Sequence, residues 1–300
     1  MSETMSPELV RQPQMEHPMA PYLRMERIPH VWCPGCGIGT VVQCYATALQ
    51  NAECDLDKVS VVSGIGCSGR AAGYLKLDAF HTTHGRAIPF ATGLKLGRPE
   101  LQVTVVSGDG DLVGIGGNHF IHAARRNVDL LVILINNFIY GMTGGQNAPT
   151  TPQEARSSTM PFGNFEQPFN LPHLAASSGA PYVARWTCLH IRRLTWAIEE
   201  ALERKGFRFI EVIAPCPTLY SRLNKLGTGL SEMRFYHDNA KICHGADTRD
   251  LGVGFHQEIV CGKFIDEPRP TFLELKDRHY EKQLGDKYVP LPDEGGMIHA

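Results

Sequence analysis

The chain has 300 residues, of which 43% are hydrophobic and 20% charged, and its formal net charge is -2 at pH 7. This length and composition suit a globular protein with a large core, built as one large domain or two small ones. The near-neutral charge offers no electrostatic basis for binding nucleic acid or an anionic membrane surface. We therefore expect no nucleic acid and no membrane among its partners.

The first 30 residues mix acidic and basic residues with prolines and lack the apolar core of a secretory signal. The longest apolar run, near residues 129–136, has the length of a strand, whereas a membrane-spanning helix needs roughly 20 residues. The sequence therefore predicts a cytoplasmic protein. In that compartment nine cysteines favour metal binding and burial over a disulfide framework.

Hydrophobic periodicity predicts helices that alternate with apolar strands, which is typical of an α/β fold with a doubly wound parallel sheet and helices on both faces. Residues 1–29 should form an extended N-terminal arm, residues 30–220 the main domain, and residues 221–300 a C-terminal extension packed on it or on a partner. The polar loop at 141–169 suggests an active-site loop. In chain order, the expected elements are a helix at 38–49, a strand at 58–63, a strand at 102–107, a helix through 119–124, a strand at 129–135, a helix at 189–204 and a strand at 207–213.

Chemically capable side chains follow four of these strands. Cys67, Asp109 and Cys216 each come just after an apolar run, and Asn136 and Asn137 do the same after residues 129–135. Because the carboxyl ends of parallel strands meet at one edge of a sheet, these residues should lie near one another. Helix N-termini also point their positive ends toward that edge, which favours an anionic ligand.

The first motif is Gly-Asp-Gly at 108–110, followed after 25 residues by Asn136-Asn137. Gly108 and Gly110 let the backbone approach a diphosphate, and Asp109 offers a hard oxygen to Mg2+. An Asn carbonyl from the neighbouring strand completes a cation site. The alternative is a plain strand-turn-helix connection in which the Asp caps the helix.

The second motif is Cys33-Pro34-Gly35-Cys36, which could hold zinc, hold an iron-sulfur cluster or act as a dithiol redox couple. A zinc ribbon needs a second Cys-x-x-Cys pair, which this chain lacks. The spacing by itself does not choose among the three.

The third motif is His81-Thr82-Thr83-His84-Gly85-Arg86. Two histidines three residues apart could bind a metal on a helix, but no third ligand with suitable spacing is visible. Recognition of a cofactor or an anionic substrate by His84 and Arg86 is therefore the favoured interpretation. Arg70 could also serve a carboxylate. His119 and His122 lie in a predicted packed helix face, and we assign them no role.

The Gly-Asp-Gly and Asn-Asn pair resembles the diphosphate-binding motif of thiamine-diphosphate enzymes. In that family the Asp, the second Asn and a main-chain carbonyl two residues beyond bind Mg2+, which implies Asp109, Asn137 and Ile139 here. The string Tyr140-Gly141-Met142-Thr143 that follows is similar to the β subunits of 2-oxoacid:ferredoxin oxidoreductases. The residues that the resemblance assigns to the cofactor are Ile65, Gly66, Cys67, His84, Gly108, Asp109, Gly110, Asp111, Asn137, Ile139, Gly141, Met142 and Thr143.

Three cysteine blocks, WCPGCG, GIGCSGR and APCPT, are similar to the cluster-binding segments of the same β subunits, and the resemblance spans residues 28–220. It implies that one 4Fe-4S cluster is bound by four thiolates. The other five cysteines are expected to be small buried hydrophobic residues rather than ligands. The implied ligands are Cys33, Cys36, Cys67 and Cys216; the excluded cysteines are Cys44, Cys54, Cys188, Cys243 and Cys261.

The resemblance implies a CoA-dependent oxidative decarboxylation of a 2-oxoacid, with electrons passed through the cluster to ferredoxin. Related β subunits that act on 2-oxoglutarate carry a stretch like His81–Arg86, which favours 2-oxoglutarate and succinyl-CoA over pyruvate. A non-redox thiamine-diphosphate decarboxylase is the remaining enzyme alternative. The reverse carboxylation would use the same groups.

Thiamine catalysis also needs a glutamate near the aminopyrimidine, and no Glu of this chain stands at a strand end. In the resembled family that glutamate comes from another chain. The resemblance therefore implies an α subunit, an (αβ)2 heterotetramer and an active site at the junction of the two chains. This chain alone is expected to be inactive.

Overall fold

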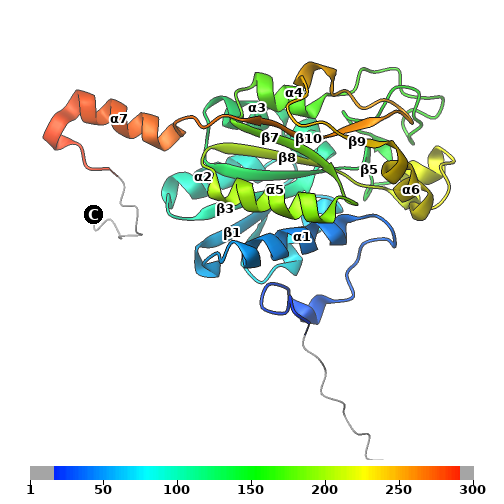
Figure 1. The fold of residues 1–300 in the computed structure, drawn as a ribbon, viewed down its shortest axis with the longest axis horizontal. Coiled ribbons are helices and arrows are strands. Elements are labelled where there is room, and N and C mark those ends of the chain that lie inside the picture. The colour runs from blue at the N-terminus through cyan, green and yellow to red at the C-terminus, as the bar shows by residue number, and fades with distance from the viewer. Residues whose placement is uncertain (1–16, 291–300) are drawn as a thin grey trace, which may run out of the picture.

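In the computed structural model, residues 17–290 are described, so most of the predicted N-terminal arm and the last ten residues of the predicted C-terminal extension lie outside the described residues. The fold is built on one eight-stranded sheet with the order β2-β1-β3-β4-β8-β7-β10-β9 (Figure 1). All neighbouring strands are parallel except β7 and β10. The strands of this sheet are β1 (Val59–Ser63), β2 (Asp78–His81), β3 (Gln102–Gly108), β4 (Leu130–Asn136), β7 (Tyr182–Thr187), β8 (Phe207–Ile213), β9 (Ala240–Ile242) and β10 (Ile259–Asp266).

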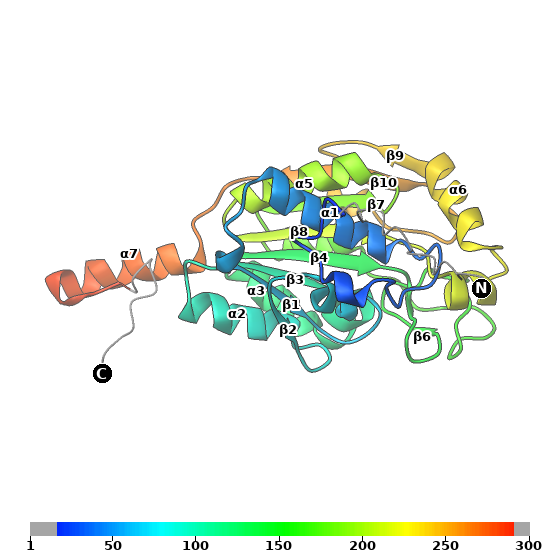
Figure 2. The ribbon, with the colours of Figure 1, turned by 90° about the horizontal axis from the view of Figure 1, so that it is seen from below.

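Helices cover both faces of this sheet, so the predicted doubly wound α/β fold is confirmed. In Figure 2, α1 and α5 lie together on one face, and α2 and α3 lie on the other. The helices are α1 (Ile38–Asn51), α2 (Ala87–Gly97), α3 (Gly117–Arg125), α4 (Leu171–Ser177), α5 (Ile191–Glu203), α6 (Gly229–Asn239) and α7 (Phe272–Leu284), and a separate hairpin is formed by β5 (Ile139–Tyr140) and β6 (Gln146–Asn147).

Strand β4 shows why the sheet needs helices on both sides. All seven of its residues are buried. The side chains of Leu131 and Ile133 join the hydrophobic cluster with α1 and α5, whereas Leu130 and Val132 join the cluster with α2, α3 and α4. Because successive side chains of a strand point to opposite faces, an uninterrupted apolar run can only be buried in a sheet covered on both sides.

Several elements were absent from the sequence-based prediction. The edge strand β2 is exposed at all four positions and therefore has no apolar pattern. Strand β7 contains Arg185, which is buried against Glu211 of β8 with a nitrogen–oxygen distance of 2.6 Å. Arg185 interrupts the apolar pattern of this short strand, and a buried Arg is tolerated there because it is paired and hydrogen-bonded.

The sheet continues past residue 220, because β9 and β10 add two strands to it. Strand β10 runs antiparallel to β7, with a register shift between Lys263 and Ile265. Such a bulge breaks the alternation of inward and outward side chains, which explains why this stretch has no readable period. Beyond it, α7 projects from the body of the molecule (Figures 1 and 2).

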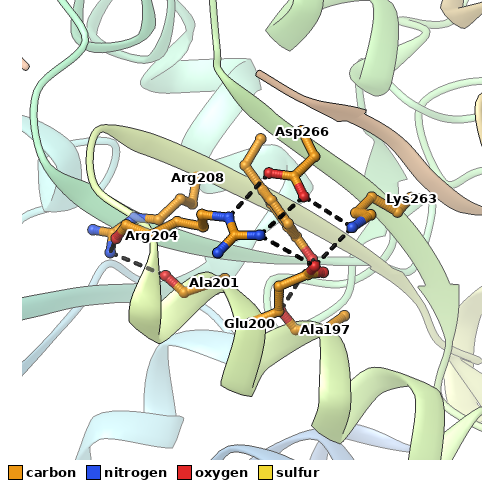
Figure 3. A network of polar contacts seen from close by, with 8 residues as sticks. Ala197, Glu200, Ala201, Arg204, Arg208, Lys263 and Asp266 are labelled. Carbon is orange, nitrogen blue, oxygen red and sulfur yellow. Dashed lines mark hydrogen bonds and ion pairs between the residues drawn. The ribbon is translucent and has the colours of Figure 1, made fainter. Parts of the chain in front are cut away.

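A polar network joins β10 to the end of α5 (Figure 3). The Arg204 guanidinium lies 3.1 Å from Asp266, and the Lys263 amine lies 2.7 Å from Glu200 and 2.9 Å from Asp266. The Tyr182 hydroxyl donates to Glu200 at 3.1 Å. These contacts lie at the amino ends of β7 and β8, away from the edge where the motif residues gather, so their role is to hold β10 in the sheet.

Candidate functional site

One pocket lies beyond the carboxyl ends of β1, β3 and β4. It brings together every residue that the sequence assigned to the cofactor, and it adds Ser68 and Tyr140, which stand in the motif strings but were not assigned to the cofactor. The lining residues are Ile65, Gly66, Cys67, Ser68, His84, Gly108, Asp109, Gly110, Asp111, Asn137, Ile139, Tyr140, Gly141, Met142 and Thr143.

Asp111 holds the loops around this pocket. Its Oδ1 accepts hydrogen bonds from the amides of Ile65 at 3.1 Å and Gly85 at 2.8 Å, and its Oδ2 accepts from the Ser107 hydroxyl at 2.9 Å. The Nδ1 of His84 lies 2.6 Å from the same carboxylate. Asp111 therefore ties the loop after β1 and the His-Thr-Thr-His turn to the end of β3.

Asp109 is 2% exposed, and its Oδ2 accepts a hydrogen bond from the Thr150 hydroxyl. Burial raises the pKa of this carboxyl to about 7. Within residues 17–290 no Lys, Arg or His forms an ion pair with it. A buried carboxylate without a cation is costly, and a bound divalent cation would supply the missing charge.

Tyr140 fills the space that two glycines leave open. Its hydroxyl donates to the carbonyl of Gly110 at 3.0 Å. A Cβ on Gly110 would lie 2.4 Å from the Tyr140 ring, and one on Gly114 would lie 2.3 Å from its hydroxyl oxygen. The motif glycine is therefore required by a side chain from β5 as well as by any ligand. Burial, with the nearby Asp109 and Asp111, raises the pKa of Tyr140.

The four predicted cluster ligands line a second cavity beside the first. Gly141 of the first pocket lies against two of these thiols, because an added Cβ there would lie 3.6 Å from the sulfur of Cys216 and 3.7 Å from that of Cys67. The two cavities share three lining residues, so they are neighbours. The cysteines that line the second cavity are Cys33, Cys36, Cys67 and Cys216, and the shared residues are Cys67, Asn137 and Met142.

Two polar contacts hold the cysteine loops in place. The Trp32 indole N–H donates to the carbonyl of Cys67 at 2.8 Å, and the Thr218 hydroxyl donates to the Cys33 sulfur at 3.1 Å. The first joins the N-terminal cysteine block to the loop after β1, and the second joins it to the turn after β8. The cysteine set is therefore drawn from three separate segments of the chain.

The thiols act on one another electrostatically. Burial, together with the other three cysteines of the set, raises the pKa of Cys67 to about 11. Burial also raises the pKa of Cys36, with added contributions from Cys33 and Cys216. Across the described part of the chain, however, no three His, Cys, Asp or Glu side chains are arranged to hold a single metal ion.

The five excluded cysteines differ in exposure. Cys44, Cys188 and Cys261 are buried, as expected, but Cys54 is only partly buried and Cys243 is exposed. The expectation of burial was therefore wrong for Cys243, which lies just past the short edge strand β9, where nothing covers it.

The two candidate recognition residues of the His-Thr-Thr-His-Gly-Arg turn lie in different environments. His84 lines the cofactor pocket, whereas Arg86 is exposed and contacts Nε2 of His119 on α3. His119, to which the sequence gave no role, is therefore the neighbour of a candidate substrate residue. Its pKa is lowered by partial burial and by the Arg86 charge. His81 ends the exposed strand β2, and Arg70 is exposed after the Cys67 loop.

The helices of residues 17–290 are all too short or too polar to cross a membrane. Residues 64–212 match the family model described as thiamine pyrophosphate enzyme, C-terminal TPP binding domain. This segment contains the loop after β1, the Gly-Asp-Gly turn and the Asn-Asn pair.

Curated relatives match almost the whole chain. The "2-oxoglutarate synthase subunit KorB" of Methanothermobacter marburgensis is 47% identical, over 88% of this chain and 92% of that protein. The KorB subunit of Archaeoglobus fulgidus is 53% identical, over 82% and 91%. A solved structure of 2-oxoglutarate:ferredoxin oxidoreductase from Magnetococcus marinus, with 2-oxoglutarate, coenzyme A and succinyl-CoA bound, superposes with a TM-score of 0.79 at 30% identity, covering 90% of this chain and 91% of that chain. The chain therefore belongs to the family of 2-oxoglutarate synthase KorB subunits, the β subunits of 2-oxoacid:ferredoxin oxidoreductases.

Proposed function

We propose that this chain is the subunit that binds thiamine diphosphate, Mg2+ and one 4Fe-4S cluster in a 2-oxoglutarate:ferredoxin oxidoreductase. The reaction converts 2-oxoglutarate, coenzyme A and two oxidised ferredoxins into succinyl-CoA, carbon dioxide, one proton and two reduced ferredoxins. The observation that carries the proposal is the shared wall of the two cavities, at Cys67, Asn137 and Met142. Because of these shared residues, the pocket that we assign to the diphosphate lies next to the four thiols.

The donor set of the first pocket fits a magnesium diphosphate. The Asp109 carboxylate, the Asn137 amide oxygen and the Ile139 carbonyl are hard oxygen ligands of the kind that Mg2+ takes. Gly108 and Gly110 line the pocket with main chain rather than side chain, which suits contacts from backbone amides to phosphate oxygens. Thiamine diphosphate, when bound, supplies the electron sink that allows a 2-oxoacid to lose carbon dioxide.

The cysteine cavity fits an iron-sulfur cluster better than a zinc ion. A zinc ion binds its thiolates at about 2.3 Å in a tetrahedron, so the sulfur atoms of a zinc site must lie about 3.8 Å from one another. No such site exists among residues 17–290, although the four thiols still influence one another's pKa. A 4Fe-4S cluster binds each thiolate through a different iron atom, so its four ligands need not meet at one tetrahedral ion.

The substrate assignment rests on the turn at residues 81–86 and on the relatives. His84 lines the pocket, and Arg86, two residues further along the turn, is exposed and contacts His119. A guanidinium there suits the second carboxylate of a dicarboxylic 2-oxoacid. The Magnetococcus marinus enzyme binds 2-oxoglutarate, coenzyme A and succinyl-CoA. Pyruvate is the alternative substrate, and it would have no use for this second cationic contact.

The pocket also indicates a partner. Among the described residues, the carboxylates that line the pocket are Asp109 and Asp111. We assign Asp109 to the cation, and Asp111 already accepts hydrogen bonds from the amides of Ile65 and Gly85, so neither is free to bind the aminopyrimidine. The glutamate that thiamine catalysis requires must therefore come from an α subunit, in an (αβ)2 assembly. A reducing cytoplasmic compartment is supported by nine free thiols.

The deciding experiment is anaerobic purification of the chain with its α subunit, followed by iron and sulfide analysis and by spectra before and after dithionite. We expect a band near 400 nm that bleaches on reduction and a turnover that requires thiamine diphosphate, coenzyme A and ferredoxin. Parallel assays with 2-oxoglutarate and pyruvate decide the substrate. A colourless, zinc-containing protein would contradict the redox assignment.

A further inference from the structure

A loop between β6 and α4 displays three phenylalanines to solvent. Phe162 is 99% exposed, Phe165 76% and Phe169 48%, and they lie within eight residues of one another. We call residues 160–169 the phenylalanine loop. Large aromatic side chains with this exposure are uncommon on a protein that works alone, because burying them against a partner is strongly favourable.

The loop is held in a defined conformation by Asn164, which is 4% exposed. The Asn164 side-chain amide donates to the carbonyl of Thr151 at 2.7 Å, and its main-chain amide donates to Ala155 at 2.8 Å. Its Oδ1 accepts from the amide of Glu166 at 3.1 Å. Gly163, with φ +112°, allows the tight turn beside it. The flanking phenylalanines are therefore presented on a preorganised frame, which lowers the entropy cost of binding.

The segment that precedes the phenylalanine loop is bonded to a residue of the cofactor pocket, and Asn164 of the loop is hydrogen-bonded to Thr151 of that segment. Thr150 donates to Asp109, and the Thr151 hydroxyl donates to the carbonyl of Phe138 at 2.6 Å. At the other end, the Phe169 amide donates to the carbonyl of Pro149 at 2.8 Å. A molecule bound on this loop would therefore lie beside the pocket that lacks its own glutamate.

We propose that Phe162 and Phe165 are the anchors on which the α subunit docks to complete the cofactor site. This inference rests on the proposed function for the identity of the partner. Aromatic side chains, Phe among them, are enriched in the buried centre of protein–protein interfaces. The α subunit should present an apolar pocket to them, close to the glutamate that it contributes.

Two other occupants are less well supported. Ferredoxin must bind and leave in each cycle, and it needs to approach the cysteine cavity, which the phenylalanine loop does not line. A second copy of this chain would also cover the phenylalanines, but the proposed function requires a different subunit to supply the glutamate. Both possibilities remain outcomes of the test.

The test is the double variant Phe162→Asp/Phe165→Asp, co-expressed with the α subunit and studied by size-exclusion chromatography with light scattering over a dilution series. Loss of two anchors should weaken the α–β complex about 100-fold or more. The variant chain should keep its circular dichroism spectrum and its absorbance near 400 nm. Trp196→Asp is the matched control, since this α5 side chain is also 61% exposed and should leave assembly unchanged.

An unchanged α–β complex in the double variant would overturn the proposal. So would an intact complex combined with loss of self-association, which points to a second copy, or with a raised KM for ferredoxin alone. If the double variant does not fold, Phe162→Ala decides, because a 99% exposed ring contributes no packing within the chain. Weakened assembly in a chain that carries no cluster would support the docking and contradict the proposed function.

Discussion

The Thr150 hydroxyl donates a hydrogen bond to the carboxylate of Asp109, although the two residues are 41 positions apart. The bond fixes the orientation of the carboxylate that we assign to Mg2+, and it joins the loop after β6 to the end of β3. Groups that orient a metal ligand in this way typically contribute as much as 10- to 100-fold to metal affinity.

Thr150→Val should therefore weaken Mg2+-dependent binding of thiamine diphosphate by about 10- to 100-fold, because the substitution removes the hydroxyl and keeps the volume. Isothermal titration of the α–β complex measures the affinity. Thr92→Val is the control, since this α2 hydroxyl bonds only to the carbonyl of Ile88. Equal affinities in both variants would remove Thr150 from the cofactor site.

Asp109→Asn should abolish magnesium-dependent cofactor binding without unfolding the chain. Burial raises the pKa of Asp109 to about 7, so the ionised form is unfavourable in the cofactor-free protein. A neutral amide at this position removes that cost, and stability at pH 8 should stay equal or rise. Thermal unfolding of the cofactor-free chain gives the comparison, and a marked loss of stability would argue for a structural role.

Cys67→Ala should eliminate the absorbance near 400 nm and most of the bound iron, because Cys67 lies in both cavities and is one of four candidate ligands. Cys261→Ala is the matched control, since Cys261 is equally a free thiol and is buried in β10. An intact cluster with normal electron transfer in Cys67→Ala would contradict the ligand assignment.

Glu232 on α6 is predicted to reduce stability as the pH rises. It is 3% exposed, and burial raises its pKa from 4.5 to about 7, although the Ser221 hydroxyl donates to it. Because the folded-state pKa lies above the unfolded value, the unfolded chain ionises first, and stability falls between pH 4.5 and 7. Glu232→Gln should therefore gain at most about 3 kcal/mol over wild type at pH 8 and little at pH 4.5.

Urea unfolding of the cluster-free chain at several pH values measures this effect. Tyr220 and Tyr236 face the same carboxyl and stay neutral over this range, since burial raises the pKa of each well above its ordinary value. Glu258→Gln, a half-exposed position, should show no pH-dependent difference. A constant difference between wild type and Glu232→Gln at all pH values would rule out the ionisation.

Arg86→Met should raise the KM for 2-oxoglutarate about 10-fold or more, because it removes the proposed contact to the second carboxylate. Pyruvate has no second carboxylate for Arg86 to bind, so its turnover should stay nearly unchanged. Arg70→Met tests the competing arginine beside the Cys67 loop. If Arg70→Met produces the selective effect and Arg86→Met does not, the substrate contact belongs to the loop after β1. Steady-state assays with both acids in the full complex provide the measurement.

The fold class followed from local patterns. The largely apolar strands β3 and β4 and the fully buried strand β8 alternate with amphipathic helices, and such strands fit a sheet covered on both faces. The convergence of Cys67, Asp109, Asn137 and Cys216 followed too, because parallel strands deliver their carboxyl ends to one edge. The family resemblance drawn from the motif blocks is confirmed by the relatives.

The sequence by itself thus determined the sheet type, the edge that carries the chemistry and the kinds of ligand there, since each depends on a short-range period or spacing. Only the tertiary structure decided which side chains from distant segments contact the motif residues. Thr150 donates a hydrogen bond to Asp109, Tyr140 donates one to the carbonyl of Gly110, and His119 contacts Arg86. It also decided that β10 returns antiparallel with a bulge. These contacts join distant segments through packing and hydrogen bonding, and such pairings leave no periodic signal in the chain.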